Sequence, residues 1–396
     1  MGHKPLRVLQ VVRAVPGGGA EAWLLKITRQ FDPGQFKFDF CALWPPSASF
    51  CEDVAALGGQ VIVCPFRSNL VTFPLRFRRT LRVGQYDVVH AHVGWPIGLV
   101  LRQAMLERVP TRIAHSHNSD DLHPNSLLRN AWRAAMGNAI RRYATSGLAC
   151  SAEAARFLFG PDWRSDARFR VFHCGINLDP FRTAPSREET RKELGIPVDA
   201  PVVGHVGLFQ PRKNQAFLLQ VGREILKVRP DARLLLVGDG PLRPQIEAMA
   251  REYGMEKNVV FAGQRPDVPR LMLSVMDVFA LPSFEEGLAI VLTEAQAAGL
   301  HSLASSAVPA EAGVVPGGLE QLSLSEGPKP WAATLLRMLE SGRMDRQIAL
   351  DAIERTDFDI RQSCSKLTQM YGSGELSVPK VETRNSKLEI RNSQTP

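Results

Sequence analysis

Residues 283–299 read SFEEGLAIVLTEAQAAG, a loop that leads into an apolar stretch with helical spacing. An apolar run, Val278 to Leu281, precedes it and predicts a buried strand. Glu286 and Glu294 lie eight residues apart in this stretch. If both were helical, they would be separated by roughly 12 Å along the axis and about 80° around it. Both carboxylates could then face one groove.

Three backbone amides follow Glu286 at the expected start of this helix. The first N–H groups of a helix have no partner within it and lie at the positive end of its dipole. They therefore suit a phosphate or a sugar hydroxyl, while Glu294 reaches a more distant diol. The alternative is a surface helix whose acidic start only complements its dipole. The three residues are Gly287, Leu288 and Ala289.

Short apolar runs alternate with helical stretches along most of the chain. Examples are LRVLQVV at residues 6–12, YDVVHA at 86–91 and VVGHVGL at 202–208. Apolar strands between helices indicate a parallel sheet that is covered on both faces. We therefore predict an α/β protein built on doubly wound parallel sheets, whose ligands gather at the carboxyl ends of the strands.

The length and the pattern divide the chain into two such units. A chain of 396 residues can form two cores, and the βα pattern loosens between Phe172 and Pro201. We place a hinge near His173 and expect two Rossmann-like domains that face each other across a cleft. The expected parts are residues 1–172, residues 173–356, a terminal helix at 357–372 and a disordered tail at 373–396.

The first apolar strand runs into a glycine loop, PGGGAE at residues 16–21. Glycines allow a phosphate to approach the backbone at the start of the following helix. The loop matches neither GxGxxG nor a GxxxxGK[ST] phosphate loop, and no acidic residue marks a dinucleotide site after the second strand. A dinucleotide-dependent oxidoreductase is therefore not favoured, and a flexible turn is the alternative reading of the loop.

Four histidines follow strand candidates in the first half: His90, His92, His115 and His117. Each H-x-H pair would alternate faces, and no carboxylate or cysteine set completes a ligand cluster of typical spacing, so we expect no metal site. His117 is expected to donate a hydrogen bond to a substrate hydroxyl or phosphate. The others would be structural, with His115 in the core.

The charge is unevenly distributed. Residues 1–175 hold 22 Lys and Arg against 12 Asp and Glu, a net +10, while the whole chain carries +8. Part of the excess alternates with apolar side chains, which suits an anionic lipid surface. The alternative is an ordinary helix with one solvated face, and no recognised motif favours nucleic acid. The arginines concerned are Arg67, Arg76, Arg78, Arg79 and Arg82.

The six cysteines are scattered without a CxxC pair, which indicates reduced thiols and a cytoplasmic protein. The short N-terminal apolar run lacks the features of a signal peptide, and no window approaches eighteen apolar residues. We expect a soluble or peripherally attached protein.

Several motifs together resemble the family 4 glycosyltransferases, retaining enzymes of the GT-B fold, and in particular those that build capsular or exopolysaccharides. The most specific is E-x7-E, from Glu286 to Glu294. The PGGGAE loop, YDVVHAH, HSHN, VGDGPL and FAGQRPDV also match in order and spacing. The resemblance runs from about Leu6 to Tyr371.

The resemblance implies roles for individual residues. Glu286 would contact hydroxyls of the donor sugar near its reacting face, and His117 would touch the sugar or the phosphate nearest to it. Glu294 would bind the ribose diol. Lys213 would neutralise the diphosphate, with Gly18 and Gly19 assisting from the other domain. The amides of Gly287, Leu288 and Ala289 would lie beside the sugar, and Arg265 would lie where the family holds the base.

One position departs from the family pattern. The family has arginine after the glycine that precedes the lysine loop, whereas this chain has Gly207-Leu208. Arg212, next to Lys213, is the candidate replacement cation. The diphosphate leaves with negative charge while the sugar becomes oxocarbenium-like, so fixed cations lower the barrier and no metal is required.

The leading hypothesis is a transferase that moves a sugar from a nucleotide diphosphate sugar, UDP- or GDP-linked, to a lipid-linked or oligosaccharide acceptor in cell-envelope polysaccharide synthesis. It would act at the inner face of the plasma membrane. A sugar-nucleotide epimerase of the same plan and a catalytically silent binding homologue are the alternatives.

Overall fold

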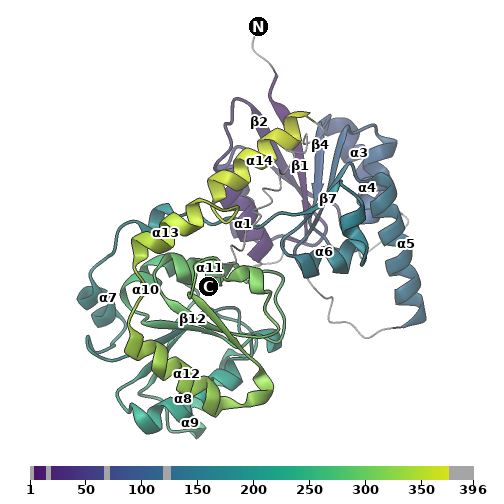
Figure 1. The fold of residues 1–396 in the computed structure, drawn as a ribbon. Helices are drawn as coiled ribbons and strands as arrows, with labels where there is room; N and C mark the ends of the chain where they lie inside the picture. Colours follow the sequence, from purple (N-terminus) through teal and green to yellow (C-terminus); the bar gives the residue numbers. More distant parts are fainter. Residues whose placement is uncertain (1–3, 15–18, 67–71, 119–125, 374–396) are drawn as a thin grey trace, which may run out of the picture.

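The computed structural model describes residues 4–14, 19–66, 72–118 and 126–373. Two parallel sheets, each flanked by helices, make up the fold (Figure 1). None of the helices in these ranges is long and apolar enough to cross a bilayer. The prediction of an α/β protein with two doubly wound parallel sheets is confirmed.

The first sheet has seven strands in the order β3-β2-β1-β4-β5-β6-β7. Its strands are β1 (Leu6–Val12), β2 (Phe36–Ala42), β3 (Val61–Val63), β4 (Val88–Ala91), β5 (Thr111–Ser116), β6 (Ser146–Ala149) and β7 (Phe169–Val171). The helices between them are α1 (Gly19–Thr28), α2 (Ala48–Ala56), α3 (Phe73–Gly84), α4 (Ile97–Leu106), α5 (Leu127–Tyr143) and α6 (Ala152–Phe159).

The second sheet has six strands in the order β10-β9-β8-β11-β12-β13. They are β8 (Val202–Val206), β9 (Arg233–Val237), β10 (Val259–Gly263), β11 (Val278–Leu281), β12 (His301–Ser305) and β13 (Leu319–Leu322). The helices of this half are α7 (Arg187–Glu193), α8 (Gln215–Val228), α9 (Arg243–Glu252), α10 (Val268–Ser274), α11 (Ile290–Ala297), α12 (Pro328–Ser341) and α13 (Arg346–Glu354).

The strand order reverses once in each sheet, and these two switch points position the site. In the first sheet the reversal lies between β1 and β4, and in the second between β8 and β11. Loops that leave neighbouring strands in opposite directions open a crevice at such a point, where doubly wound sheets bind ligands. The loops after β1, β4, β8 and β11 are therefore the first places to look for function.

The last helix, α14 (Ile360–Ser373), returns to the first sheet and lies near α1 and β1 (yellow in Figure 1). The hydroxyl of Tyr371 on α14 lies 2.8 Å from Nδ1 of His90 and 3.2 Å from Nε2 of Gln10 on β1. A bridge between Ile176 and Asp359 also joins the start of this segment to the chain after β7. Residues near the end of the chain thus support the interior of the first sheet.

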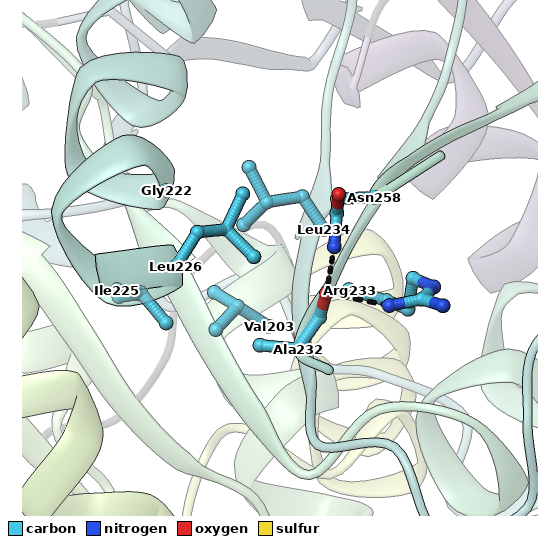
Figure 2. A pocket seen from close by; sticks show the side chains of 8 residues that line it. All are labelled: Val203, Gly222, Ile225, Leu226, Ala232, Arg233, Leu234 and Asn258. Carbon is cyan, nitrogen blue, oxygen red and sulfur yellow. Dashed lines mark hydrogen bonds between the residues drawn. The ribbon is translucent and has the colours of Figure 1, made fainter. Parts of the chain in front are cut away.

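The second half holds a small apolar cavity of about 10 Å³ between α8 and the edge of β9 (Figure 2). Ile225, Leu226 and Leu234 line it, and the amide of Asn258 donates to the carbonyl of Ala232 at 2.9 Å beside it. A space of this size holds at most one water molecule. It is a packing defect of the core and not a ligand site.

The helix in the stretch 283–299 begins later than the sequence indicates. α11 starts at Ile290, and Ala289 before it adopts a left-handed conformation with φ 58°. Glu286 therefore lies in the loop after β11, and the helical spacing used to relate Glu286 to Glu294 does not apply. The amides of residues 287–289 belong to this loop and not to the first turn, so the expected start of the helix is wrong, while their contact with a ligand stays a prediction.

Candidate active site

Lys213 and Glu286 form an ion pair at the switch point of the second sheet. Lys213 follows β8 and Glu286 follows β11, and the distance from Lys213 Nζ to Glu286 Oε1 is 2.5 Å. Their side chains are 11% and 7% exposed. Ser283 Oγ also donates to Glu286 Oε1, at 2.7 Å. Buried charges require such partners, so the two loops are held together by the charges they carry.

The two loops are also tied through their backbones. The amide of Phe284 donates to the carbonyl of Arg212 at 2.8 Å, and Ser305 Oγ donates to the carbonyl of Ser283 at 2.5 Å. Each loop ends in a left-handed residue before its helix, Asn214 before α8 and Ala289 before α11. For alanine this conformation costs about 1–3 kcal/mol, and such strain concentrates at functional sites.

His205, next to the last residue of β8, lies beneath this ion pair and was not predicted from the sequence. Its Nδ1 donates to the carbonyl of Ala280 at 3.0 Å, and its Nε2 lies 3.3 Å from Nε2 of Gln215. Burial lowers the pKa of His205 to about 4. The ring is therefore neutral at neutral pH and adds no second charge below Lys213.

The departure at Leu208 leaves a cation to be supplied from elsewhere. The carbonyl of Leu208 accepts a hydrogen bond from Gln215 at 3.0 Å, so the residue shapes the loop through its backbone. Among the described residues, the guanidinium of Arg212 has neither an ion-pair nor a hydrogen-bond partner. Arg212 is thus a cation of the lysine loop that remains available for a ligand.

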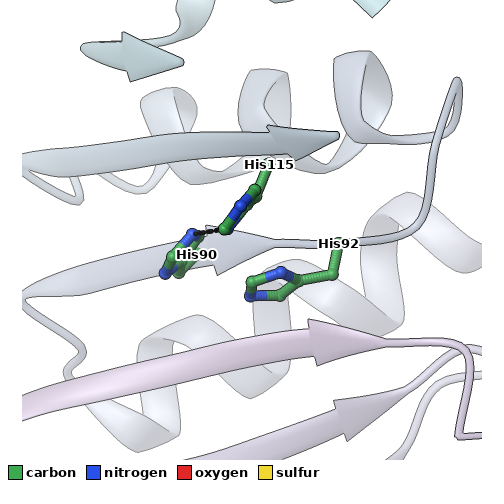
Figure 3. Close-up of side chains that lie close together, drawn as sticks. All are labelled: His90, His92 and His115. Atoms are coloured by element: carbon green, nitrogen blue, oxygen red, sulfur yellow. Dashed lines mark hydrogen bonds between the residues drawn. The ribbon is translucent and has the colours of Figure 1, made fainter. Parts of the chain in front are cut away.

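The switch point of the first sheet brings the four histidines together. His90 and His92 lie at the end of β4, and His115 and His117 at the end of β5, with ring centroids of neighbouring pairs 4.1–5.2 Å apart. Figure 3 shows three of them, His90, His92 and His115, facing one another. Burial lowers the pKa of all four, that of His117 to about 4, so all are neutral.

Gln10 and Tyr371 fix the direction of the hydrogen bonds in this cluster. The Gln10 amide N–H donates to the Tyr371 hydroxyl, and the Gln10 carbonyl oxygen, an acceptor only, receives the N–H of His92 Nε2 at 2.8 Å. A neutral imidazole has one donor and one acceptor. His92 Nδ1 therefore accepts, at 2.8 Å, from Nε2 of His117.

The requirement for one donor and one acceptor in each neutral imidazole also sets the direction of the hydrogen bonds from Tyr371 through His90 to His115. The Tyr371 hydroxyl accepts from Gln10 and donates to His90 Nδ1, so His90 Nε2 donates to His115 Nδ1 at 3.2 Å. His115 Nε2 is left buried and without a hydrogen-bond partner in the described part of the chain. His117 Nδ1 carries a lone pair, and the Sγ of Cys174 lies 3.7 Å from it.

The first and second halves of the chain contact each other at the predicted site. An added Cβ on Gly287 would lie 2.0 Å from the backbone carbonyl oxygen of His117. Lys26 on α1 reaches Glu294 on α11 with an Nζ to Oε1 distance of 3.3 Å, and the amide of Ala152 donates to Glu311 at 3.1 Å. Glu286 and Glu294 therefore both lie on the side of the second sheet that faces the first.

The remaining predicted residues divide into three groups. Leu288 and Ala289 are buried beside Glu286 in the loop after β11. Gly19 begins α1 and has open space where a side chain would be, whereas Gly18 lies outside the described residues. The guanidinium of Arg265 is already held by Asp267 at 2.7 Å and Glu193 at 2.9 Å, so its contact with a base stays a prediction.

Two parallel α/β sheets, with Lys213 and Glu286 at the switch point of one and histidines at that of the other, have the architecture of the GT-B fold. Residues 17–180 match the family described as Glycosyltransferase Family 4, and residues 186–355 match Glycosyl transferases group 1. The chain belongs to this family of glycosyltransferases, as its motifs predicted, and it is an enzyme of that class.

Individual relatives agree with this assignment. EpsF of Bacillus subtilis, which carries the name of a glycosyltransferase, is 32% identical over 375 residues, 94% of this chain and 97% of EpsF. The D-inositol 3-phosphate glycosyltransferase of Corynebacterium efficiens is 27% identical over 307 residues, covering 72% of this chain and 71% of its own. The crystal structure of HepE from Anabaena has a TM-score of 0.75 at 21% identity, with 92% of this chain and 99% of HepE covered.

Proposed function

We propose that this protein is a retaining glycosyltransferase that moves a sugar from a nucleotide diphosphate sugar to a glycan acceptor, lipid-linked or oligosaccharide, in cell-envelope polysaccharide synthesis. The domain comprising residues 173–356 would hold the donor, and residues 1–172 would present the acceptor. The terminal helix at 357–372 would join the two. The main support for the proposal is the buried Lys213–Glu286 ion pair, which lies close to the segment that carries His117.

Donor binding would exchange this ion pair for contacts with the ligand. Lys213 would turn its ammonium to the diphosphate, and Glu286 would accept hydrogen bonds from hydroxyls of the sugar. A lysine–glutamate pair offers one group for each half of such a ligand, because phosphates require cations and sugar hydroxyls are good donors to carboxylates. The exchange keeps both charges paired throughout, which their burial requires.

Charge separation would drive the reaction. The diphosphate takes up negative charge as the glycosidic bond breaks, and cations that are already in place stabilise it more in the transition state than in the ground state. Lys213 and Arg212 are those cations. In the proposed same-face route, a diphosphate oxygen accepts the proton of the attacking acceptor hydroxyl, so no metal and no carboxylate nucleophile is involved.

Glu294 and His117 would complete the donor site. Glu294 would bind the ribose diol and give up its contact with Lys26, a pair whose lysine is 51% exposed and therefore weakly held. His117 would accept a hydrogen bond from a sugar hydroxyl through Nδ1, because its Nε2 already donates to His92. Gly18 and Gly19 would supply amides to the diphosphate. Leu288 and Ala289 lie next to Glu286 and would place their amides beside the sugar.

Relatives with solved structures support a nucleotide-sugar donor. HepE was crystallised in complex with UDP and with UDP-glucose. WaaG, with a TM-score of 0.68 and 18% identity, is described as a glycosyltransferase involved in lipopolysaccharide biosynthesis. A UDP-sugar donor and an envelope glycan acceptor are the corresponding proposals for this chain.

We place the protein at the cytoplasmic face of the plasma membrane, bound through α3. Arg76 and Arg79 are exposed on this helix, and Leu75 and Val83 beside them are 68% and 77% exposed. Arg78 and Arg82 are instead paired with Glu107, the residue that follows α4, and Arg67 lies outside the described residues. Exposed apolar and cationic side chains on one helix suit an anionic lipid surface.

Two further features of the first half were not predicted from the sequence. A groove of about 560 Å³ lies between α3 and β3, with Arg76 and Arg79 among its lining residues. At the start of α5, Leu127 and Leu128 are 90% and 86% exposed. These apolar side chains are candidates for contact with the lipid portion of an acceptor.

A thermal-shift panel of nucleotide sugars, followed by transfer assays with the best donor, tests the function. A bound donor raises the melting temperature by linkage. Glu286→Gln should keep most of the donor affinity but reduce transfer by about 100-fold. Glu256→Gln, an exposed glutamate at the far end of the same half, should leave both unchanged. Full transfer by Glu286→Gln would remove its assigned role, and donor binding without transfer by the wild type would favour the silent homologue.

Liposome sedimentation with anionic vesicles tests the membrane proposal. Arg76→Ala/Arg79→Ala should reduce the bound fraction strongly, because each basic side chain near the surface contributes about 1 kcal/mol. Arg251→Ala/Arg355→Ala removes two exposed arginines of the second half and should not change it. Equal sedimentation of the two double variants would contradict a lipid surface on α3.

A further inference from the structure

Two overlapping groups of potential metal ligands lie at the switch point of the first sheet. One is His90, His92 and His115, and the other is His115, His117 and Cys174, with the ligand atoms in each group within 4.8 Å of one another. From the sequence we expected no metal site at these histidines. Cys174 follows β7 and meets His117 only through the fold. The hydrogen bonds decide which group is open to a cation.

The first group has its ring nitrogens engaged already. His90 uses both nitrogens, for Tyr371 and His115, and His92 uses both, for Gln10 and His117. Figure 3 shows how closely these three rings approach one another. A cation there would break several buried hydrogen bonds, each expensive to lose.

The second group offers atoms that lack strong partners. His115 Nε2 is buried and has no hydrogen-bond partner within the described ranges. His117 Nδ1 is the acceptor nitrogen of its ring, and its neighbour is the Cys174 thiol at 3.7 Å. Zinc bonded tetrahedrally to nitrogen and sulfur would hold those two atoms roughly 3.6 Å apart. The spacing between His117 Nδ1 and Cys174 Sγ therefore suits a cation bound to both.

We propose that His115, His117 and Cys174 form a three-ligand site for Zn²⁺, with water in the fourth position, and that an occupied site inhibits the transferase. Two imidazoles and a thiolate are a ligand set that zinc prefers over magnesium or calcium. Binding replaces the proton on the thiol of Cys174 with the cation and releases that proton to solvent.

The surrounding hydrogen bonds provide the support that a metal site requires. Histidines that bind metal donate their other ring N–H to a neighbour, which fixes the ring orientation. For His117 this bond exists, from Nε2 to Nδ1 of His92. For His115, coordination through Nε2 makes Nδ1 the donor to His90 Nε2. His90 Nδ1 then donates to the Tyr371 hydroxyl, which can accept as well as donate.

Burial keeps Cys174 in its thiol form when no cation is present. The desolvated surroundings and the neighbouring Cys150 raise the pKa of the Cys174 thiol, so a cation must displace the proton. His117 is the ligand with some exposure to solvent, whereas Cys174 and His115 are buried. The cation therefore reaches the site past His117.

Inhibition rests on the proposed function, because it requires His117 to contact the donor. With Nδ1 bound to zinc and Nε2 bound to His92, the ring has no remaining atom for a hydrogen bond to sugar or phosphate. The carbonyl of His117 lies against Gly287, so a shift of this residue also reaches the loop that carries Glu286.

Titration of the reduced, metal-free, full-length protein with Co²⁺ tests the site independently of activity. We expect one Co²⁺ per chain with a thiolate-to-cobalt charge-transfer band that Zn²⁺ abolishes. Cys174→Ser should lose the band. Cys364→Ser, which removes a buried thiol on α14, should keep it. His117→Gln should weaken Zn²⁺ binding at least about tenfold by calorimetry. No band in the wild type, or the same band in Cys174→Ser, would overturn the site.

A transfer assay separates the two parts of the proposal. Zn²⁺ should inhibit the wild type, EDTA should restore activity, and Cys174→Ser should be less sensitive. Binding without inhibition would keep the site but overturn the inhibition and the donor contact of His117. Absence of Zn²⁺ binding would remove the site and leave the transferase assignment intact.

Discussion

The Cα atom of Gly287 packs against the backbone carbonyl of His117. A Cβ atom at residue 287 would lie 2.0 Å from that oxygen and 3.3 Å from the Sγ of Cys150. These residues come from different sheets, so the contact sets how closely the Glu286 loop approaches the histidine wall. Only glycine fits at residue 287 without moving the Glu286 loop away from the segment that carries His117.

Gly287→Ala should therefore reduce transfer while leaving the fold intact. The methyl group must displace the loop or the facing wall, and a misplacement of about 1 Å in an active site can cost on the order of 100-fold in rate. Gly372→Ala is a suitable control, because an added Cβ there meets nothing within 4 Å. Steady-state kinetics with circular dichroism would show the difference, and equal rates for the two variants would refute the steric argument.

Glu294→Ala should weaken nucleotide binding about tenfold, since the ribose diol loses its carboxylate partner. The same change also removes the ion pair with Lys26, so that pair needs its own control. Lys26→Ala breaks only the partly exposed pair and should alter affinity little. If calorimetry gave the same loss of nucleotide affinity for both variants, Glu294 would act by holding α1 and α11 together and not by binding the ligand.

His205 should link stability to pH. Burial lowers the pKa of His205 to about 4 from its ordinary 6.5. Below pH 6.5 the unfolded chain takes up a proton at this residue, whereas the folded chain does not until about pH 4. The free energy of unfolding should thus be highest above pH 6.5 and fall between pH 6.5 and 4, by up to about 1.4 kcal/mol per pH unit from this residue.

Urea unfolding across this pH range measures the effect. His205→Asn keeps an N–H group that can donate to Ala280 but cannot titrate, so its stability should depend less steeply on pH. The other buried histidines contribute to both proteins alike. Identical slopes for wild type and variant would show that His205 is not responsible.

Arg191 should be essential to the stability of the second half. Its side chain is fully buried and donates to four backbone carbonyls and one carboxylate, those of Pro197, Val198, Ala200, Val275 and Asp277. Arg191→Met removes this donor from the buried carbonyls of Ala200 and Val275 and should cost about 3 kcal/mol or more. Arg229→Met, an exposed pair with Asp231, should stay within about 0.5 kcal/mol by denaturant melts. Similar losses for both would contradict this view.

The sequence predicted the βα order because buried parallel strands are continuous apolar runs. β12 and β13 were not predicted, because neither strand is a continuous apolar run. His301–Ser305 contains two serines, and Leu319–Leu322 is a half-exposed edge strand with polar side chains. Neither carries the apolar signal on which the prediction depended.

The start of α11 could not be predicted either. Ala289 favours helix by propensity, and only its surroundings hold it in the left-handed conformation that delays the helix to Ile290. Glu286 and Lys213 were found through the motif, although nothing in their spacing shows that they pair. Such a contact depends on the strand order β8-β11, which brings residues 73 positions apart together.

The histidine cluster shows the same limit. The sequence places the H-x-H pairs at strand ends, but Tyr371, Gln10 and Cys174, which orient the rings, come from α14, β1 and the segment after β7. Sequence spacing carries no information on such contacts, and for that reason a group of potential metal ligands was not expected there.

The proposed function requires Lys213 and Glu286 to form the donor site. Calorimetry with UDP and GDP in metal-free buffer tests this directly. We predict that at least one of the two binds the wild type and Lys257→Met, an exposed lysine of the same half, with equal affinity. Lys213→Met should bind it about tenfold more weakly or worse. Equal affinity in Lys213→Met, or no binding of either nucleotide to the wild type, would contradict the account.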